Sequence, residues 1–315
     1  MAYTKHFSEL SKEDVSIAGG KGASLGEMFS SGIPVPPGFV VLSGAFEKFI
    51  KDNEIDIEID AALDAVNPKE MHTIEDASEK IHALILNEDM PGNISREITA
   101  AFERLNAEFV AVRSSATSED SAMAAWAGQL ESYLNTTKKD LLTNVKRCWV
   151  SLFTPRAIFY KFEKGIPKQK VSVAVVVQKM VESEASGVGF SVHPVTQDEN
   201  QLIIEAGFGL GEAIVSGAIT PDSYVVDKRD LKILERCINI KTKSLHRDTN
   251  GKNKWKDLPE EHGKKQVLSD KEITELSKMI IKIEKHYGFP VDIEWGRENN
   301  KFYVLQSRPI TTLGK

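Results

Sequence analysis

Four polar side chains near the C-terminal end of the sequence could bind a metal ion and a phosphate together. They are Asp292, Glu294, Gln306 and Arg308. Alternate residues of a strand share one face, and a turn near residues 299–300 would set Glu294 opposite Gln306. Carboxylate and amide oxygens suit Mg²⁺, and an adjacent guanidinium suits a phosphate. A solvated sheet face with a cross-strand ion pair explains the same pattern equally well.

A glycine cluster around Lys21 is a second candidate anion site. The run Gly19-Gly-Lys-Gly22 opens a predicted helix that continues through Met28. Glycines let the backbone come close to a phosphate, and the N–H groups at a helix start favour anions. The run is not a Walker A loop, because the spacing Gly-x-x-x-x-Gly-Lys-Ser/Thr is missing. A glycine-rich helix cap without a ligand is the other interpretation.

A third candidate follows the predicted buried strand 109–113. Arg113 ends this strand, and a predicted polar turn begins at Ser114. A guanidinium followed by hydroxyl groups can clamp a phosphate, although a strand-end salt bridge would look the same. Gly128 and Ser132 lie in the loop that follows, where they could be simple turn residues.

Gln178 is a fourth candidate, because it ends the apolar run Val175-Val-Val and precedes Lys179. Such a strand can present backbone groups to a base while its side chains wall the pocket. A core strand is the alternative interpretation. The glycine-rich segment 207–212 is weak evidence for a dinucleotide, and His193 is interpreted as a loop residue rather than a nucleophile.

The composition favours a globular protein of two lobes. The 315 residues are 41% hydrophobic and 27% charged, with a net charge of −6. This length exceeds what one small core usually needs, and mixed charges argue against a general nucleic-acid partner. Cys148 and Cys237 lack metal-ligand spacing. With no apolar signal core and no membrane-length apolar run, we expect a cytoplasmic protein without a membrane partner.

The periodicity of apolar residues predicts an α+β fold. Helices are expected at 43–52, 71–88, 94–105, 138–162 with a break at Pro155, and 270–286 with a cap at Gly288. Strands are expected at 171–180, 186–192, 201–205, 223–227, 231–240, 291–295 and 302–306. The polar segment 241–268 is predicted to be an exposed loop or an irregular hairpin. We therefore predict a helix-rich lobe over 1–165 and a sheet-rich lobe over 166–315.

Several fragments occur together and in one order, and their combination is far more specific than any of them alone. They include Gly19-Gly-Lys-Gly-Ala-Ser-Leu-Gly-Glu-Met28, Ala111-Val-Arg-Ser-Ser-Ala-Thr-Ser-Glu-Asp120, Ser151-Leu-Phe-Thr-Pro-Arg-Ala157, Gly209-Leu-Gly-Glu212 and Val291-Asp-Ile-Glu-Trp-Gly296. The set resembles the N-terminal nucleotide-binding domain of the phosphoenolpyruvate synthase and pyruvate phosphate dikinase family, which also includes rifampin phosphotransferase. The resemblance runs from about residue 8 to residue 312.

The resemblance implies an ATP-grasp fold, in which two α+β lobes hold ATP between them, and it implies Mg²⁺ as the metal. It assigns phosphate contacts and catalytic roles to Lys21, Arg113 and Arg308. It also assigns Gly128 and Ser132 to a loop that closes over the phosphates, Gln178 to the strand beside adenine, and Glu294 and Gln306 to the metal. Asp292 and Glu212 are further candidates.

In the family, the ATP domain passes a phosphoryl group to a histidine on a swivelling domain, and this histidine serves pyruvate bound on a third domain. None of the seven histidines lies in a glycine- and Ser/Thr-rich motif of that kind. We therefore expect a phosphohistidine carrier in cis or in trans, and pyruvate bound only by a missing domain. The chain would be an excised domain or a stand-alone subunit. The segment Ser121–Trp126 also departs from the family pattern.

Three functions remain open at this point. The first is the ATP-binding, phosphoryl-donating domain of a phosphoenolpyruvate synthase. The second is the same domain in a rifampin-phosphotransferase-like antibiotic kinase. The third is a non-catalytic ATP-sensing module, which would not need to keep all of Lys21, Arg113, Glu294, Gln306 and Arg308.

Overall fold

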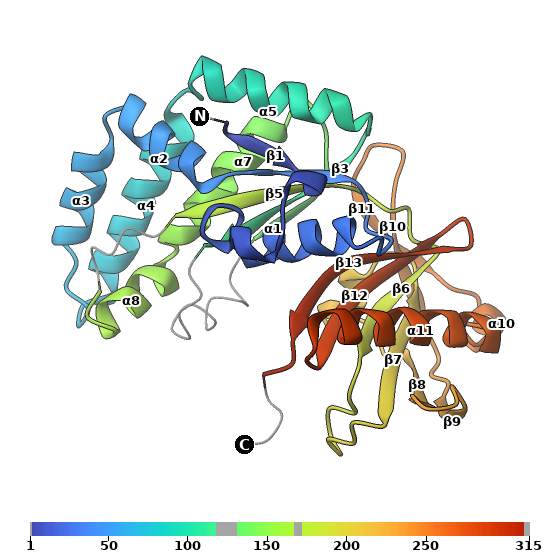
Figure 1. Ribbon diagram of the computed structural model, residues 1–315. Helices are drawn as coiled ribbons and strands as arrows, with labels where there is room; N and C mark the ends of the chain where they lie inside the picture. The colour runs from blue at the N-terminus through green and yellow to red at the C-terminus, as the bar shows by residue number, and fades with distance from the viewer. Residues whose placement is uncertain (1, 118–130, 167–171, 312–315) are drawn as a thin grey trace. The chain divides into compact units, whose positions relative to one another are not determined.

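The computed structural model describes residues 2–117, 131–166 and 172–311. The chain divides into two compact units, which we describe separately (Figure 1). Unit 1 comprises Met1–Ser30 and Pro37–Met180, and unit 2 comprises Ser31–Pro36 and Val181–Lys315. The compact units thus divide after Met180, whereas the sequence placed a lobe boundary at 165/166. The reason is that the strand at 173–179 lies inside the sheet of unit 1.

Unit 1 contains a five-stranded antiparallel sheet in the order β1-β2-β5-β3-β4. Its strands are β1 (Thr4–His6), β2 (Gly38–Val41), β5 (Val173–Lys179), β3 (Val110–Ala116) and β4 (Ser132–Thr136). Side chains from both faces of β5 are buried, because Val175 and Val177 belong to the main apolar core while Ala174 and Val176 are buried on the other face. This two-sided burial explains why 171–180 reads as a continuous apolar run.

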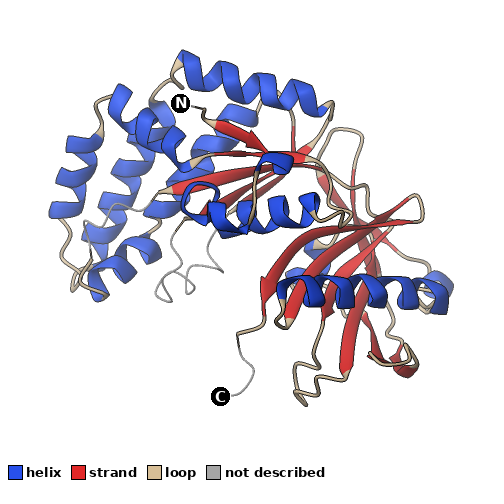
Figure 2. Ribbon diagram, in the orientation of Figure 1, coloured by secondary structure: helices blue, strands red, loops and turns tan. Residues whose placement is uncertain are grey.

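Helices α1 (Val15–Ser30), α2 (Ser43–Asp52), α5 (Gly92–Leu105) and α7 (Leu141–Val150) pack against this sheet (Figure 2). Helix α4 (Met71–Asn87) packs on α7, and α3 (Asp56–Asp64) and α8 (Pro155–Glu163) pack on α4. Short 3₁₀ turns lie at Phe7–Glu9, Lys12–Asp14 and Ser151–Phe153. The predicted break at Pro155 is confirmed, because Thr154 caps α8 and Pro155 occupies its first turn. The predicted turn at Ser114 is wrong, since β3 continues through Ala116.

Unit 2 is built on a six-stranded antiparallel sheet in the order β13-β12-β6-β7-β8-β9. Its strands are β13 (Lys301–Pro309), β12 (Val291–Glu298), β6 (Ala185–Phe190), β7 (Gln201–Phe208), β8 (Asp222–Asp227) and β9 (Ile233–Cys237). Helix α11 (Asp270–Tyr287) crosses one face (Figure 1) and buries Ile273, Leu276, Ile280 and Ile283. A capping box at Ser269 begins α11. Gly288 ends the helix at φ 77°, which confirms the predicted C-terminal cap.

The polar segment 241–268 contains the hairpin of β10 (Lys243–Arg247) and β11 (Asn253–Asp257), followed by the short helix α10 (Glu260–Gly263). Another short helix, α9 (Glu212–Val215), lies between β7 and β8 in the chain. Of the two structures predicted for this segment, an exposed loop or a hairpin, the hairpin is confirmed. The start of the segment, however, is buried and not exposed. Lys241 is fully buried because it forms an ion pair with Asp222, which is also fully buried. Within the described part of the chain, no helix has both the length and the apolar composition of a membrane span.

Candidate functional site

The β12–β13 hairpin has the register that the sequence predicted. Its two-residue turn consists of Asn299 and Asn300, whose φ angles of 51° and 58° are left-handed. Such turns match the twist of paired strands, and asparagine tolerates this conformation better than most residues. Counting back from the turn, Glu294 pairs with Gln306, and Asp292 pairs with Arg308. We call these four residues the hairpin cluster.

The alternation of side chains along β12 separates the core from the cluster. Ile293 and Trp295 are fully buried, and Ile293 lies beside Ile280 of α11, near Gly189. Asp292 and Glu294 take the opposite face and are half-buried. The register then shifts, because Trp295 pairs with Val304 and leaves Leu305 as an extra residue. A bulge at this position turns the strand directly after the Glu294–Gln306 pair, as bulges beside functional sites commonly do.

The contacts inside the hairpin cluster are long. Gln306 Nε2 donates to Glu294 Oε1 at 3.3 Å, and the Arg308 guanidinium lies 3.8 Å from the same oxygen. Arg308 is 42% exposed, so this ion pair adds little to stability. Burial raises the pKa of Asp292, the positive charge of Arg308 lowers it, and the negative charge of Glu294 raises it further. The cluster therefore places the half-exposed Arg308 guanidinium beside two neighbouring carboxylates.

This donor set fits Mg²⁺ bound together with a nucleotide. Glu294 offers carboxylate oxygens and the buried Gln306 offers an amide oxygen. In the ranges that the structure describes, no group of three or more His, Cys, Asp or Glu residues could form an all-protein metal cage. Mg²⁺ in phosphate-transferring proteins keeps waters and uses only one or two carboxylates plus the phosphates. The hairpin cluster matches this sparser requirement.

In unit 1, a kink at Gly19 shapes the glycine cluster. Helix α1 begins at Val15, is interrupted at Gly19 with φ 69° and ψ 167°, and then resumes. A Cβ atom on Gly19 would lie 2.2 Å from Ser115 Oγ, so only glycine fits this close approach. Ser115 Oγ donates to Ala18 O at 3.0 Å and accepts from Gly22 N at 3.2 Å. The cluster thus opens a second helical segment and not the whole helix.

Lys21 and Arg113 come together because β3 contacts this restarted helix. Lys21 Nζ donates to Ser114 O at 2.9 Å, next to Arg113 in the chain. Arg113 pairs with Ser132 on β4 and with Val176 on β5. Lys21, Arg113 and Ser132, which the sequence singled out, therefore lie close together around β3. The position of Gly128 falls outside the described residues, as does the segment Ser121–Trp126.

Gln178 lies on the same sheet face as Arg113. It pairs with Ala111 on β3, and paired residues share a face, which is also the face that α1 covers through Gly22 and Val40. Gln178 is 3% exposed, and its Nε2 finds no hydrogen-bond partner among the described residues. An orphaned buried amide costs about 1–3 kcal/mol. A ligand with an acceptor atom, such as a purine ring nitrogen, would offset this cost.

Glu212 hydrogen-bonds to a residue outside the hairpin cluster. It is exposed on α9 and accepts a hydrogen bond from Asn253 Nδ2 at 2.6 Å. Glu205, which the sequence did not single out, lies two strands from Glu294 on the same sheet face. The signal that could have found it is its position in 202–206, where Glu205 is the charged residue in an otherwise apolar run.

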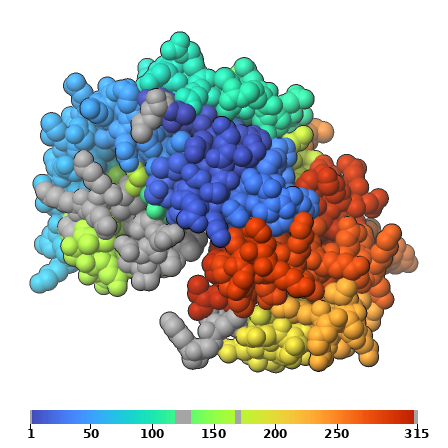
Figure 3. All heavy atoms as spheres, in the orientation of Figure 1, coloured from blue at the N-terminus to red at the C-terminus, as the bar shows by residue number. Residues whose placement is uncertain are grey.

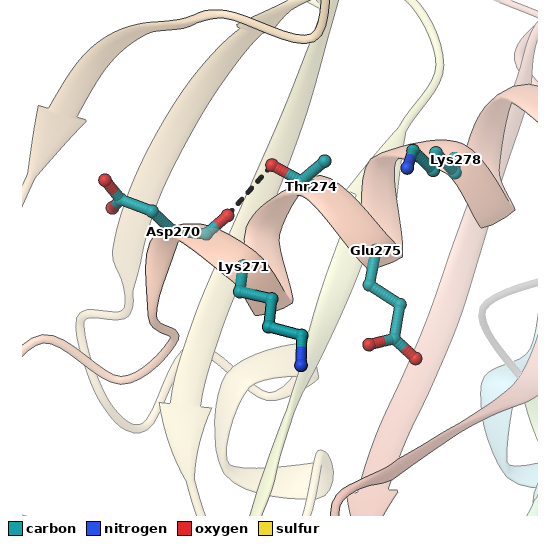
Figure 4. A pocket seen from close by; sticks show the side chains of 5 residues that line it. All are labelled: Asp270, Lys271, Thr274, Glu275 and Lys278. Carbon is teal, nitrogen blue, oxygen red and sulfur yellow. Dashed lines mark hydrogen bonds between the residues drawn. The ribbon is translucent and has the colours of Figure 1, made fainter.

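A shallow hollow on the outer side of α11 is separate from these residues (Figure 4). Its lining is Asp270, Lys271, Thr274, Glu275 and Lys278. Thr274 Oγ1 donates to Asp270 O at 2.9 Å, and no candidate residue from the sequence lines the hollow. In the space-filling view, the orange and red C-terminal part of the chain forms a continuous exposed surface of unit 2 (Figure 3). The hollow is lined only by polar and charged residues of one helix, α11, so we do not assign it to the base.

Comparison with known proteins agrees with the nucleotide interpretation. The chain is 45% identical over 322 residues to a probable phosphoenolpyruvate synthase of Methanocaldococcus jannaschii, covering 100% of this chain and 27% of that protein. It is 48% identical over 314 residues to the probable phosphoenolpyruvate synthase of Archaeoglobus fulgidus, covering 98% and 41%. It is also 38% identical over 309 residues to the rifampicin phosphotransferase of Bacillus subtilis, covering 97% and 35%.

The chain spans less than half the length of each of these relatives. The family model that matches it is described as the pyruvate phosphate dikinase, AMP/ATP-binding domain, and the match covers residues 15–315. The α+β architecture agrees with that family. Because the match extends over nearly the whole sequence, the chain belongs to the pyruvate phosphate dikinase AMP/ATP-binding domain family.

Proposed function

We propose that this chain binds Mg·ATP and passes a phosphoryl group to a histidine on another domain, as the ATP domain of a phosphoenolpyruvate synthase. The observation that carries the proposal is the Glu294–Gln306 pair with Arg308 beside it, held in register by the β12–β13 turn. The relatives named phosphoenolpyruvate synthase support this choice of activity.

Each candidate residue then has a chemical role. Glu294 and Gln306 would hold Mg²⁺, which when bound neutralises phosphate charge, and Arg308 would contact the phosphate chain. Lys21 and Arg113 would add positive charge to the phosphates, with Ser132 and Gly128 in the loop beside them. Gln178 would meet the base. Phosphoryl transfer needs mainly positioning and charge stabilisation from the protein, which such a set can supply.

The proposal requires a partner that carries the phosphoryl group. The relatives are more than twice as long as this chain, which leaves room for a histidine-bearing domain and a pyruvate-binding domain. The seven histidines of this chain lack the expected surrounding motif. We therefore propose that the carrier acts in cis or in trans, and that pyruvate is bound only by another domain.

A second candidate keeps the same ATP chemistry but changes the final acceptor. The identity of 38% to the rifampicin phosphotransferase of Bacillus subtilis favours it. The ATP domain would then charge a histidine that serves a drug hydroxyl and not pyruvate. The identity of the acceptor domain decides between the two candidates.

The proposal predicts phosphohistidine formation on a separate protein. The purified chain would be incubated with labelled ATP, Mg²⁺ and a separately expressed histidine-bearing domain from a phosphoenolpyruvate synthase. We expect acid-labile label on that domain, none after its histidine is changed to alanine, and little phosphoenolpyruvate when pyruvate is added to the chain alone. Absence of label with a folded, ATP-bound chain would refute the donor role, and steady phosphoenolpyruvate formation by the chain alone would refute the division of labour.

A further inference from the structure

Glu205 extends the hairpin cluster across the sheet of unit 2. Glu294 on β12 pairs with Val188 on β6, and Val188 pairs with Glu205 on β7. Paired residues of neighbouring strands project from the same face, so Glu294 and Glu205 share a face with Val188 between them. Two strand spacings place their backbones roughly 10 Å apart. This face is opposite to the one that α11 covers through Ile293 and Ile280.

The carboxylate of Glu205 is half-buried and lacks a counter-charge. No hydrogen bond or ion pair reaches it from residues 2–117, 131–166 or 172–311. Burial raises its pKa, and no neighbouring charge contributes to that shift. Its neighbours along β7 on the same face are Ile203, which is 7% exposed, and Gly207, which lies against Ile214 of α9. A partly desolvated acid without a partner suits a ligand that donates hydrogen bonds.

The parts of a nucleotide differ in whether they can donate hydrogen bonds to the Glu205 carboxylate. Phosphate oxygens are acceptors and carry negative charge, so they would be repelled by Glu205. The ribose carries two adjacent hydroxyl donors, and a carboxylate has two acceptor oxygens to receive them. A triphosphate anchored at Glu294 and Gln306 carries its ribose at the other end. Val188 and Ile203 provide an apolar surface beside Glu205 on which a sugar ring can rest.

We propose that Glu205 accepts hydrogen bonds from the ribose hydroxyls of the bound nucleotide and selects ATP over 2′-deoxy-ATP. This inference rests on the proposed nucleotide site. Glu205 is thus a specificity-determining residue and not a metal ligand.

The test compares the affinities of Mg·ATP and Mg·2′-deoxy-ATP by calorimetric titration. The proteins are the wild type, Glu205→Ala, the nearly isosteric Glu205→Gln and the exposed-site control Glu199→Ala. We expect the wild type and the control to prefer ATP by about tenfold or more, as for a hydrogen bond to a charged group. Glu205→Ala should bind both nucleotides equally and no more tightly than the wild type binds the deoxynucleotide, which keeps its 3′-hydroxyl, while Glu205→Gln keeps part of the preference. Circular dichroism confirms that each variant is folded.

Two results would overturn the role of Glu205. One is equal binding of the two nucleotides by the wild type, and the other is an undiminished preference in Glu205→Ala. A changed Mg²⁺ requirement in Glu205→Ala with the preference intact would assign Glu205 to a second cation and also overturn the proposal. A wild type that binds neither nucleotide would instead reject the proposed function itself, together with this inference.

Discussion

Unit 2 contains two clusters of charged side chains that differ in how deeply they are buried. In the first, Asp222 and Lys241 are both fully buried and 2.5 Å apart. The Asp222 carboxylate also accepts from Tyr224 Oη at 3.1 Å and from the backbone N–H groups of Asn239 and Val267. Lys241 Nζ also donates to Lys265 O at 2.8 Å. Protein atoms alone complete this cluster.

The hairpin cluster is arranged in the opposite way. Gln306 Nε2 and the Arg308 guanidinium lie 3.3 Å and 3.8 Å from Glu294 Oε1, and Arg308 is 42% exposed. Two carboxylates, Asp292 and Glu294, face one guanidinium. The comparison teaches that a satisfied buried network fixes the fold, here by tying the segment before β10 to β8. A half-exposed cluster of polar side chains, in contrast, stays accessible to a ligand.

The largest expected effect is the loss of the buried pair. Lys241→Met keeps most of the side-chain volume but leaves Asp222 buried without its charge partner. We expect the free energy of unfolding to fall by about 3–5 kcal/mol, measured by urea denaturation followed by circular dichroism. The control is Lys254→Met on the exposed face of β11, which should change stability by less than about 0.5 kcal/mol. Equal stabilities for the two variants would show that the buried network does not hold this segment.

Replacement of Glu205 should raise the free energy of unfolding, by less than the loss expected for Lys241→Met. Because burial raises its pKa in the folded state, the folded protein holds this proton more tightly than the unfolded chain does. Stability is therefore lost as the pH rises through the interval between the ordinary and the raised pKa. Glu205→Gln removes this penalty and should be more stable than the wild type at pH 7, by less than about 1 kcal/mol because the group is half-exposed.

Denaturation at two pH values checks the sign of this effect. Below about pH 3, where a glutamate carboxyl group is protonated in both states, the difference between Glu205→Gln and the wild type should vanish. A variant that is less stable than the wild type at pH 7 would mean that Glu205 supports the fold and is not reserved for a ligand. A loss of stability in Lys241→Met and a gain in Glu205→Gln would together show that the first charge supports the fold and the second does not.

The hairpin cluster could be predicted from the sequence because its information is local. Side chains alternate along a strand, and the paired asparagines fix the turn, so the Glu294–Gln306 pair follows by counting. The same reasoning located α11 and its cap at Gly288. The cap, the apolar stripe and the turn all depend on residues a few positions apart.

Other features depend on contacts between distant residues and could not be predicted in this way. β3 continues to Ala116 because β5 pairs with it through Val173, and this pairing also moves the division of the units to Met180. The burial of Lys241 depends on its ion pair with Asp222. Asp222 begins β8, whereas Lys241 lies beyond β9 in the chain. The kink at Gly19 arises from its contact with Ser115. Local periodicity carries no information about such partners.

Calorimetric titration of Mg·ATP into the wild type, Glu294→Ala and Arg308→Ala would decide whether the hairpin cluster grips a metal-bound triphosphate. We expect the wild type to bind, and both variants to bind at least about tenfold more weakly, which is about 1.4 kcal/mol. The control is Arg229→Ala, which removes the exposed partner of the buried Asp227 elsewhere in unit 2 and should leave the affinity unchanged. Folded variants that bind Mg·ATP as tightly as the wild type would contradict the assignment of this site.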